Sequence, residues 1–245
     1  MTTIAVLADP PVEGTVLEPF VDGPLSAAEA VELYTAMVRD VCRAVEDSGG
    51  ELLVNYRSAD HLGVDADVEQ RLREVLEPAL ETPEDVRYEV QVGETVAGRV
   101  GNTITHLLEQ EQVSTAAAVD PTAALLSRQR IDSAAMKLRS SEVVLGPSTA
   151  GRVYYAGFAD PIDFEDAYAT PTIETLTERG RAAGMSVDFL PTDPVLARPG
   201  DLRDLLPLLN ARQEADRLVP PRTTQRLLDL GFSIAPDGDE LSVVR

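Results

Sequence analysis

A glycine-punctuated stretch in the second half of the chain has the features of a ligand-binding turn. The sequence GPSTAGRVYYAG, residues 146–157, follows the apolar run EVVL and is interpreted as a turn between two strands. Glycine lets such a turn adopt positive φ and lets its backbone approach a ligand closely. This turn carries no acid, amide or lysine, and its one charged side chain is Arg152. The stretch is therefore either a working site or the remnant of one.

The common catalytic motifs are missing from the sequence. It contains no GxxxxGK[ST] loop, no GxGxxG after the first strand, no GxSxG elbow and no HExxH helix. His61 and His106 lie far apart, and each is expected to be a packed or surface residue rather than a base or metal ligand. The acids near His61 are expected to be helix caps and dipole partners: Asp60, Asp65 and Asp67.

The composition is strongly acidic. The 245 residues include 42 acids and 21 bases, for a net charge of −21, and the only lysine is Lys137. An acidic chain with almost no lysine and no tryptophan is typical of extreme halophiles, whose surface carboxylates hold water in molar salt. Nucleic acid is not expected as a partner, because a polyanion requires a basic surface. Cys42 is the only cysteine, which excludes an internal disulfide, and it is expected to be a buried helix residue.

The N-terminal stretch MTTIAVLAD has no basic region and is too short for a signal peptide, and no apolar run reaches membrane-spanning length. We therefore expect a cytoplasmic protein with no membrane contact.

Apolar strands alternate with amphipathic helices along the chain. The alternation predicts one α/β domain with a mostly parallel, doubly wound central sheet flanked by helices. Strands are predicted at 2–9, 51–57, 86–92, 113–121, 142–147, 153–158 and 186–191. Helices are predicted at 26–50, 67–80, 93–112, 127–138, 171–184, 201–215 and 220–231. Residues 232–244 are predicted to form a β-hairpin about Asp237 and Gly238.

The order of these elements resembles a known family. The chain is similar to the GT-A-type glycosyltransferase-like proteins called radical-SAM/selenodomain-associated transferase 1, distant relatives of the molybdopterin and phospholactate guanylyltransferases. The resemblance covers residues 4–210, and residues 211–245 add a helix and the hairpin to the same domain of 1–245. It is carried by PPVEG with the helix SAAEAVELYTAMVRD, by QVGETVAGRV, by VDPT, by GPSTAGRVYYAGF and by ARPGDLRDL. It implies the GT-A fold of nucleotide-diphospho-sugar transferases.

The resemblance also implies that cations should meet phosphate and that carboxylates should hold Mg²⁺ or Mn²⁺. The family's first loop, similar to KAPxPGxVKTRL, corresponds here to ADPPVEGTVLEPF, which keeps Gly14. Asp9, Leu17 and Pro19 stand at the cationic positions, with Glu18 between the last two, so this loop is expected to repel phosphate.

The acidic metal position corresponds to Asp120, followed by Pro121. Asp120 is either a metal ligand or the first residue of a turn whose carboxylate accepts backbone hydrogens. The later pattern DxDTPEDL corresponds to VLARPGDL, in which Val195 and Ala197 replace two acids and Asp201 is retained as an expected helix cap.

Two further segments bear on ligand binding. The pattern GPxxDGGYYLIG has Ala150, Gly151 and Arg152 in place of its acid and glycine pair, so the scaffold of the turn persists while its chemistry is lost. A stretch similar to QxGxxLGxR retains Gln91, Gly93, Gly98 and Arg99, which are together either a nucleotide or sugar contact or a strand-to-helix turn. In the second case Arg99 would be a surface residue paired with Glu94 or another acid.

Three functions remain open on these residues. The first is a degenerate, catalytically inactive domain that binds a nucleotide or nucleotide sugar weakly and acts in binding or regulation. The second is an active, divergent glycosyltransferase or nucleotidyltransferase with a divalent metal at Asp120 and with arginines replacing the lysines: Arg99, Arg128, Arg130 and Arg152. The third is a partner in a larger protein assembly, which would expose an apolar patch.

The charge leads to a test of the halophilic interpretation. We expect the melting temperature to rise from low to molar KCl, because salt screens the repulsion among the excess carboxylates within about 3 Å at 1 M. Thermal melts across a KCl series measure this, and a melting temperature that stays level or falls contradicts it.

Overall fold

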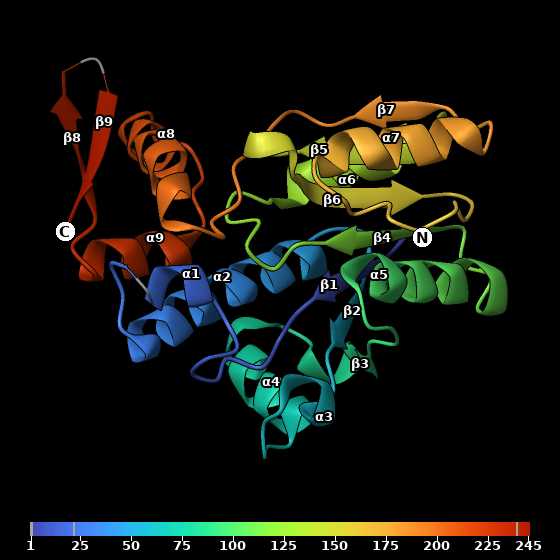
Figure 1. Ribbon diagram of the computed structural model, residues 1–245, viewed down its shortest axis with the longest axis horizontal. Helices are drawn as coiled ribbons and strands as arrows, with labels where there is room; N and C mark the ends of the chain where they lie inside the picture. The colour runs from blue at the N-terminus through green and yellow to red at the C-terminus, as the bar shows by residue number, and fades with distance from the viewer. Residues whose placement is uncertain (1, 22, 239) are drawn as a thin grey trace.

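Seven strands form one sheet in the computed structural model, which describes residues 2–21, 23–238 and 240–245. Their order across the sheet is β3-β2-β1-β4-β6-β5-β7 (Figure 1). Their bounds are Thr2–Leu7 (β1), Glu51–Tyr56 (β2), Arg87–Val90 (β3), Thr115–Val119 (β4), Val143–Pro147 (β5), Val153–Phe158 (β6) and Val187–Phe189 (β7).

All the paired strands are parallel except β6, which runs antiparallel to both β4 and β5. The predicted α/β fold with a mostly parallel sheet is confirmed. The reversal of β6 has a simple cause, because residues 148–152 are too few for the crossover that a parallel neighbour requires. β6 consequently begins at the edge where β4 and β5 end. The backbone N–H of Asp120 donates to the carbonyl of Tyr154 at 3.1 Å, so Asp120 and the 146–157 turn lie at the same edge.

Helices cover both faces of the sheet. Their bounds are Glu18–Val21 (α1), Ala27–Glu46 (α2), Ala59–Leu62 (α3), Val68–Leu76 (α4), Val96–Thr105 (α5), Arg128–Lys137 (α6), Thr172–Ala182 (α7), Leu202–Glu214 (α8) and Pro221–Asp229 (α9). Buried side chains of α2, α4 and α6 share one apolar core with Ile4 and Val6 of β1. Those of α5 and α7 share the other core with Ala5. Strand β1 is apolar from Ile4 to Leu7 because both of its faces are covered.

Local sequence accounts for most helix ends. Ser26 and Glu29 form the predicted capping box of α2, and Cys42 is fully buried within that helix. The one-turn helices α1 and α3 were not predicted. The α-helix α5 ends at Thr105 and continues as a π-helical turn over His106–Gln110, inside the stretch expected to be α-helical. No helix of the described part of the chain is both long enough and apolar enough to cross a membrane.

The C-terminal elements form a group at one end of the molecule. Strands β8 (Ser233–Asp237) and β9 (Glu240–Val244) pair antiparallel, which confirms the predicted hairpin, and Gly238 adopts φ +63° in its turn. Residue 239 lies outside the described residues. Figure 1 shows this hairpin beside α8 and α9.

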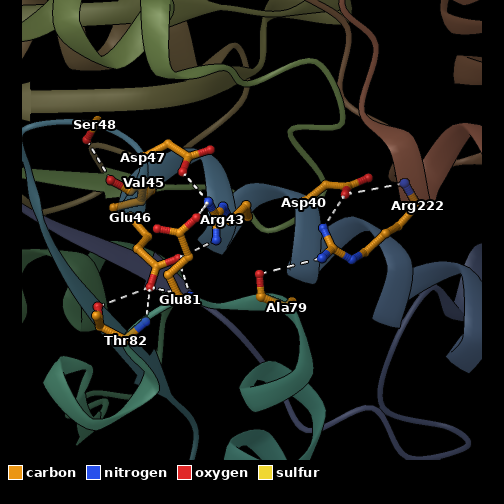
Figure 2. Close-up of polar contacts among 10 residues, drawn as sticks. All are labelled: Asp40, Arg43, Val45, Glu46, Asp47, Ser48, Ala79, Glu81, Thr82 and Arg222. Atoms are coloured by element: carbon orange, nitrogen blue, oxygen red, sulfur yellow. Dashed lines mark hydrogen bonds and ion pairs between the residues drawn. The ribbon is translucent and has the colours of Figure 1, made fainter.

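A buried carboxylate joins this group to the rest of the core. Asp40 of α2 accepts from the backbone N–H and hydroxyl of Thr223 at 2.7 and 2.9 Å, and from the Arg222 guanidinium at 3.2 Å. Figure 2 shows Arg222 reaching both Asp40 and the carbonyl of Ala79. Asp40 therefore caps the first turn of α9 from another helix and balances a charge there.

This cap generates a stability prediction. We expect Asp40→Ala to lower the free energy of unfolding by about 2–3 kcal/mol, because the variant leaves Arg222 and two donors of Thr223 without their acceptor. The matched control is Asp47→Ala, about two helical turns further along at the C-cap of α2, where Asp47 forms an exposed pair with Arg43 (Figure 2). Asp47→Ala should lower the free energy of unfolding by at most about 1 kcal/mol. Denaturant unfolding at constant KCl measures both, and equal losses would contradict the assigned role of Asp40.

Candidate functional site

A cavity of about 400 Å³ lies at the carboxyl edge of the sheet, between the ends of β1 to β4, the start of β6 and helix α5. Strand and α5 residues supply an apolar wall. Its charged and amide side chains are Asp9, Arg57, Gln91, Arg99, Asp120 and Arg152. The structure therefore brings together four of the residues singled out from the sequence: Gln91, Arg99, Asp120 and Arg152.

Asp9 does not present a free negative charge to this cavity. The Arg57 guanidinium contacts it with two donors, Nε to Oδ1 at 2.8 Å and Nη2 to Oδ2 at 2.6 Å. The hydrogen bond to Asp9 raises the pKa of Arg57. Leu17 is buried, and neither it nor Glu18 lines the cavity. The carboxylate through which the first loop was expected to repel phosphate is therefore engaged in an ion pair, and the repulsion itself stays a prediction.

Arg57 was not identified from the sequence, although a signal for it exists. Leu7 of β1 pairs with Asn55 of β2, so the residues two positions further along these parallel strands are Asp9 and Arg57. An acid and an arginine that each directly follow a buried strand are therefore expected to meet if those strands are neighbours. The order of the strands was the missing information.

Asp120 is the first residue of a turn, which is one of the two roles expected for it from the sequence. Its Oδ1 accepts from the backbone N–H of Thr122 at 2.8 Å and from the Thr122 hydroxyl at 2.7 Å. Burial raises the pKa of Asp120, while the hydrogen bonds from Thr122 and the charge of Arg152 act in the opposite direction. Its role as a metal ligand stays a prediction.

Arg152 is held on Asp201 by two contacts, Nη1 to Oδ2 at 2.9 Å and Nη2 to Oδ1 at 2.5 Å. Asp201 also accepts the backbone N–H groups of Ala197 and Arg198, both at 2.9 Å, which lie before the 3₁₀ turn Pro199–Asp201. Its side chain makes no capping hydrogen bond to α8, so the expectation that it caps the helix from residue 201 is corrected: it caps the preceding turn. The hydrogen bonds to Asp201 raise the pKa of Arg152, and the nearby charge of Asp120 adds to this effect. The guanidinium of Arg152 is therefore paired with Asp201 at the sheet edge.

These donors do not fit a divalent metal. Within the described residues, no three histidine, cysteine or acidic side chains are grouped in a way that could hold a metal ion. Both oxygens of Asp201 and one oxygen of Asp120 already accept hydrogen bonds. Mg²⁺ and Mn²⁺ need several oxygen ligands, and a guanidinium beside the site repels them.

Arg99 lies on the first turns of α5 and is half-buried. Its Nη1 donates to the backbone carbonyl of Glu94 at 3.0 Å. Among residues 2–21, 23–238 and 240–245, no carboxylate lies within 4.0 Å of its guanidinium. The expected ion pair with the Glu94 side chain is thus replaced by a contact with the Glu94 backbone. Burial lowers the pKa of Arg99, and the neighbouring charge of Arg57 lowers it further.

Gln91 is fixed at the end of β3. Its Nε2 donates to the carbonyl of Asn55 at 2.7 Å, and its backbone N–H donates to the carbonyl of Tyr56, also at 2.7 Å. The amide nitrogen is therefore engaged by β2, whereas the side-chain oxygen is the part of Gln91 that a ligand could use.

The three glycines proposed as ligand contacts do not line the cavity: Gly14, Gly93 and Gly151. Gly93 has φ +127°, and a Cβ there would lie 2.9 Å from the backbone of Gly98, so this glycine allows the loop to pack on α5. Gly151 has φ +71°, and its Cβ would meet Pro171 at 2.7 Å. These positions need glycine for backbone geometry and packing.

The remaining candidates lie elsewhere. Arg128 forms an exposed pair with Asp132, and Arg130 contacts the buried Asp193 at 2.7 Å, so neither lines the cavity beside Arg99. His61 and His106 are both exposed, as expected.

Comparison with solved structures identifies the fold. A Desulfovibrio desulfuricans G20 protein, provisionally named a nucleotide-diphospho-sugar transferase, superimposes with a TM-score of 0.75 at 17% identity, covering 94% of this chain and 96% of that one. The 4-diphosphocytidyl-2C-methyl-D-erythritol synthase of Anaerococcus prevotii DSM 20548 gives a TM-score of 0.51 at 12% identity, covering 85% and 95%. No family model matches the chain, and no curated protein sequence does. The chain has the fold of nucleotide-diphospho-sugar transferases, in a single α/β domain.

The raised pKa of Asp120 leads to a pH prediction. Because its folded-state pKa lies above the ordinary value of 3.8, ionised Asp120 destabilises the fold at neutral pH, and this cost disappears as pH falls and the carboxyl is protonated. Asp120→Asn keeps an oxygen for Thr122 without the charge. We expect the variant to melt above the wild type at pH 7 and the difference to shrink towards pH 4. Parallel melts from pH 4 to 8 measure it, and a variant that melts lower at pH 7 disproves the assignment.

Proposed function

We propose that this chain is a nucleotide-diphospho-sugar transferase-like domain that binds an anionic ligand of the nucleotide class in the carboxyl-edge cavity and performs no metal-dependent transfer. The observation that carries the proposal is Arg99, a half-buried guanidinium in the cavity lining whose only described polar contact is a backbone carbonyl. Binding, assembly or regulation is then the role of the domain.

The energetic cost of partly burying the charged Arg99 side chain without an ion-pair partner supports binding of an anion. A cation that loses water without gaining an ion-pair partner destabilises the protein. The nearby charge of Arg57 adds to that cost, and the charges of Asp9 and Glu94 offset part of it. A phosphate or carboxylate that enters the cavity would offset both effects, with the planar guanidinium donating two parallel hydrogen bonds. Perturbed ionisable groups in a concave site are typical of functional positions.

The cavity also suits the rest of a nucleotide. Its volume of about 400 Å³ lies within the usual range for small-molecule sites, and its walls combine apolar residues with the oxygen of Gln91. The names of the two similar structures both refer to nucleotide-diphosphate compounds. A single counterion-free arginine cannot engage a whole diphosphate, so we expect weak affinity.

The absence of transfer chemistry follows from the donor set. Asp120 offers one unengaged oxygen, and Asp201 is occupied by Arg152 and two backbone donors. The site therefore does not supply the ligands for a divalent ion that would stabilise a leaving diphosphate.

Isothermal titration calorimetry with GTP, UTP and UDP-glucose tests the proposal, at the lowest KCl concentration that keeps the protein folded. We expect a Kd of about 1 mM or weaker, equivalent to about −4 kcal/mol, unchanged between Mn²⁺ and EDTA. Arg99→Ala should abolish the binding heat because it removes the anion contact. The matched control is Arg128→Ala, which removes the same charge from an exposed pair outside the cavity.

Two results would contradict the proposal. Micromolar binding that requires Mn²⁺ and is lost in Asp120→Ala would favour an active transferase with a metal at Asp120. Equal binding by the wild type and Arg99→Ala would show that the nucleotide does not bind through Arg99. If none of the three compounds binds at 10 mM, a Kd that corresponds to a binding free energy of about −3 kcal/mol, the cavity is not a nucleotide site.

A further inference from the structure

Two adjoining grooves lie on either side of the seam between α2 and α9. The first, of about 750 Å³, is bounded by α2, the first turn of α6 and the segment that joins α8 to α9. The second, of about 740 Å³, is bounded by α2, α4 and α9. Pro221 and Arg222 line both grooves, and Figure 1 shows α9 beside α2 at this place. No described residue lines both a groove and the carboxyl-edge cavity.

The lining of these grooves reverses the charge balance of the chain. The whole protein has 42 acids and 21 bases. Six arginines and three aspartates line the first groove, and four arginines and three acids line the second, with Arg222 common to both. We call the pair the arginine grooves. An anion that enters them meets an excess of positive side chains, although the protein as a whole carries a negative charge.

Some of these arginines have no carboxylate of their own within the fold. Arg130 and Arg212 share Asp193, at 2.7 and 3.6 Å, so one negative charge serves two cations. Among residues 2–21, 23–238 and 240–245, no carboxylate lies within 4.0 Å of the guanidinium of Arg39 or Arg217. Because Arg39 lines the second groove and Arg217 the first, each groove offers a positive charge to a partner.

The environment of Arg39 favours an incoming anion. Arg39 is half-buried, and its Nε donates to the carbonyl of Val75 at 2.7 Å. Burial lowers the pKa of Arg39, and the neighbouring charge of Arg222 lowers it further. A carboxylate that paired with Arg39 would offset both effects, since a guanidinium can donate two parallel hydrogen bonds to it.

An apolar side chain beside Arg217 indicates the class of partner. Leu218 is 93% exposed, more than any other large apolar side chain of the described residues. It lies in the lining of the first groove, next to the buried Leu125 and Leu126. Arginine next to an apolar contact is typical of protein interfaces. The described lining of both grooves contains no aromatic side chain, so the stacking surface that single-stranded nucleic acid uses is missing.

We propose that the arginine grooves and Leu218 form a docking surface for an acidic segment of a partner protein. Carboxylates of the segment pair with Arg39 and Arg217, and an apolar side chain of the segment covers Leu218. One extended segment can occupy both grooves, because they meet at Arg222. The surface is separate from the nucleotide-class ligand of the carboxyl-edge cavity.

Fluorescence anisotropy of a labelled peptide tests the proposal, with the full chain at the lowest KCl concentration that keeps it folded. The peptide consists of glutamate and aspartate with a central pair of leucines. We expect saturable binding, and none of a peptide with glutamine and asparagine in place of the acids. Arg39→Ala and Arg217→Ala should each weaken binding about threefold and together about tenfold, because the two positions lie in separate grooves. Leu218→Ser should weaken it about threefold.

The matched control is Arg139→Ala, which removes an exposed arginine outside both grooves and should bind the peptide as the wild type does. Circular dichroism establishes that each variant is folded. Arg39→Gln, which can keep the hydrogen bond to Val75 without the charge, replaces an Arg39→Ala protein that is not folded.

Three results would overturn the docking surface. The first is no binding of the acidic peptide by the wild type. The second is equal binding by the wild type and the protein that combines Arg39→Ala with Arg217→Ala. The third is equal displacement of the peptide by a single-stranded DNA oligomer of the same net charge, which would indicate a general polyanion site. The test contains no nucleotide ligand of the cavity, so its outcome is independent of the Arg99 experiment.

Discussion

The two-point contact between Arg152 and Asp201 joins the turn before β6 to the loop that follows β7, and the candidate site depends on it. Asp201 simultaneously fixes the backbone of Ala197 and Arg198, so one carboxylate positions a loop, a helix start and a guanidinium. The reversal of β6 places this assembly beside Asp120, because the antiparallel strand begins where β4 ends. A parallel β6 would have begun at the opposite edge of the sheet.

Pairing of charges also explains how an acidic chain can form a cavity suited to an anion. The whole protein has a net charge of −21, yet the cavity lining contains three arginines and two aspartates. Asp9 is neutralised by Arg57, and Arg152 is paired with Asp201. Local charge, which depends on which side chains the strand order brings together, is therefore far less negative than the charge of the chain.

The sequence predicted the layers of the fold and the residues of the site more successfully than their contacts. The alternation of apolar strand-like and amphipathic helix-like segments identified every strand of the sheet. The signal is strongest for the central strands, which are buried on both faces, and weaker for the partly buried edge strands β3 and β7. Residue types also pointed to Arg99, Asp120 and Arg152. Sequence alone did not supply the strand order, which decides that Arg57 meets Asp9. The role of Gly93 was left open between two alternatives for a related reason: positive φ at a turn indicates a need for glycine, but not whether a ligand or the backbone of Gly98 lies opposite.

The choice of arginine over lysine suits a fixed internal cation. Lys137, the only lysine, contacts a single oxygen of Asp188 at the surface, whereas Arg57 and Arg152 each engage both oxygens of a buried or half-buried carboxylate. A two-point contact defines orientation as well as distance, and partial burial protects it from screening by salt. Arg57 and Arg152 therefore hold their positive charges at fixed positions in the lining of the cavity.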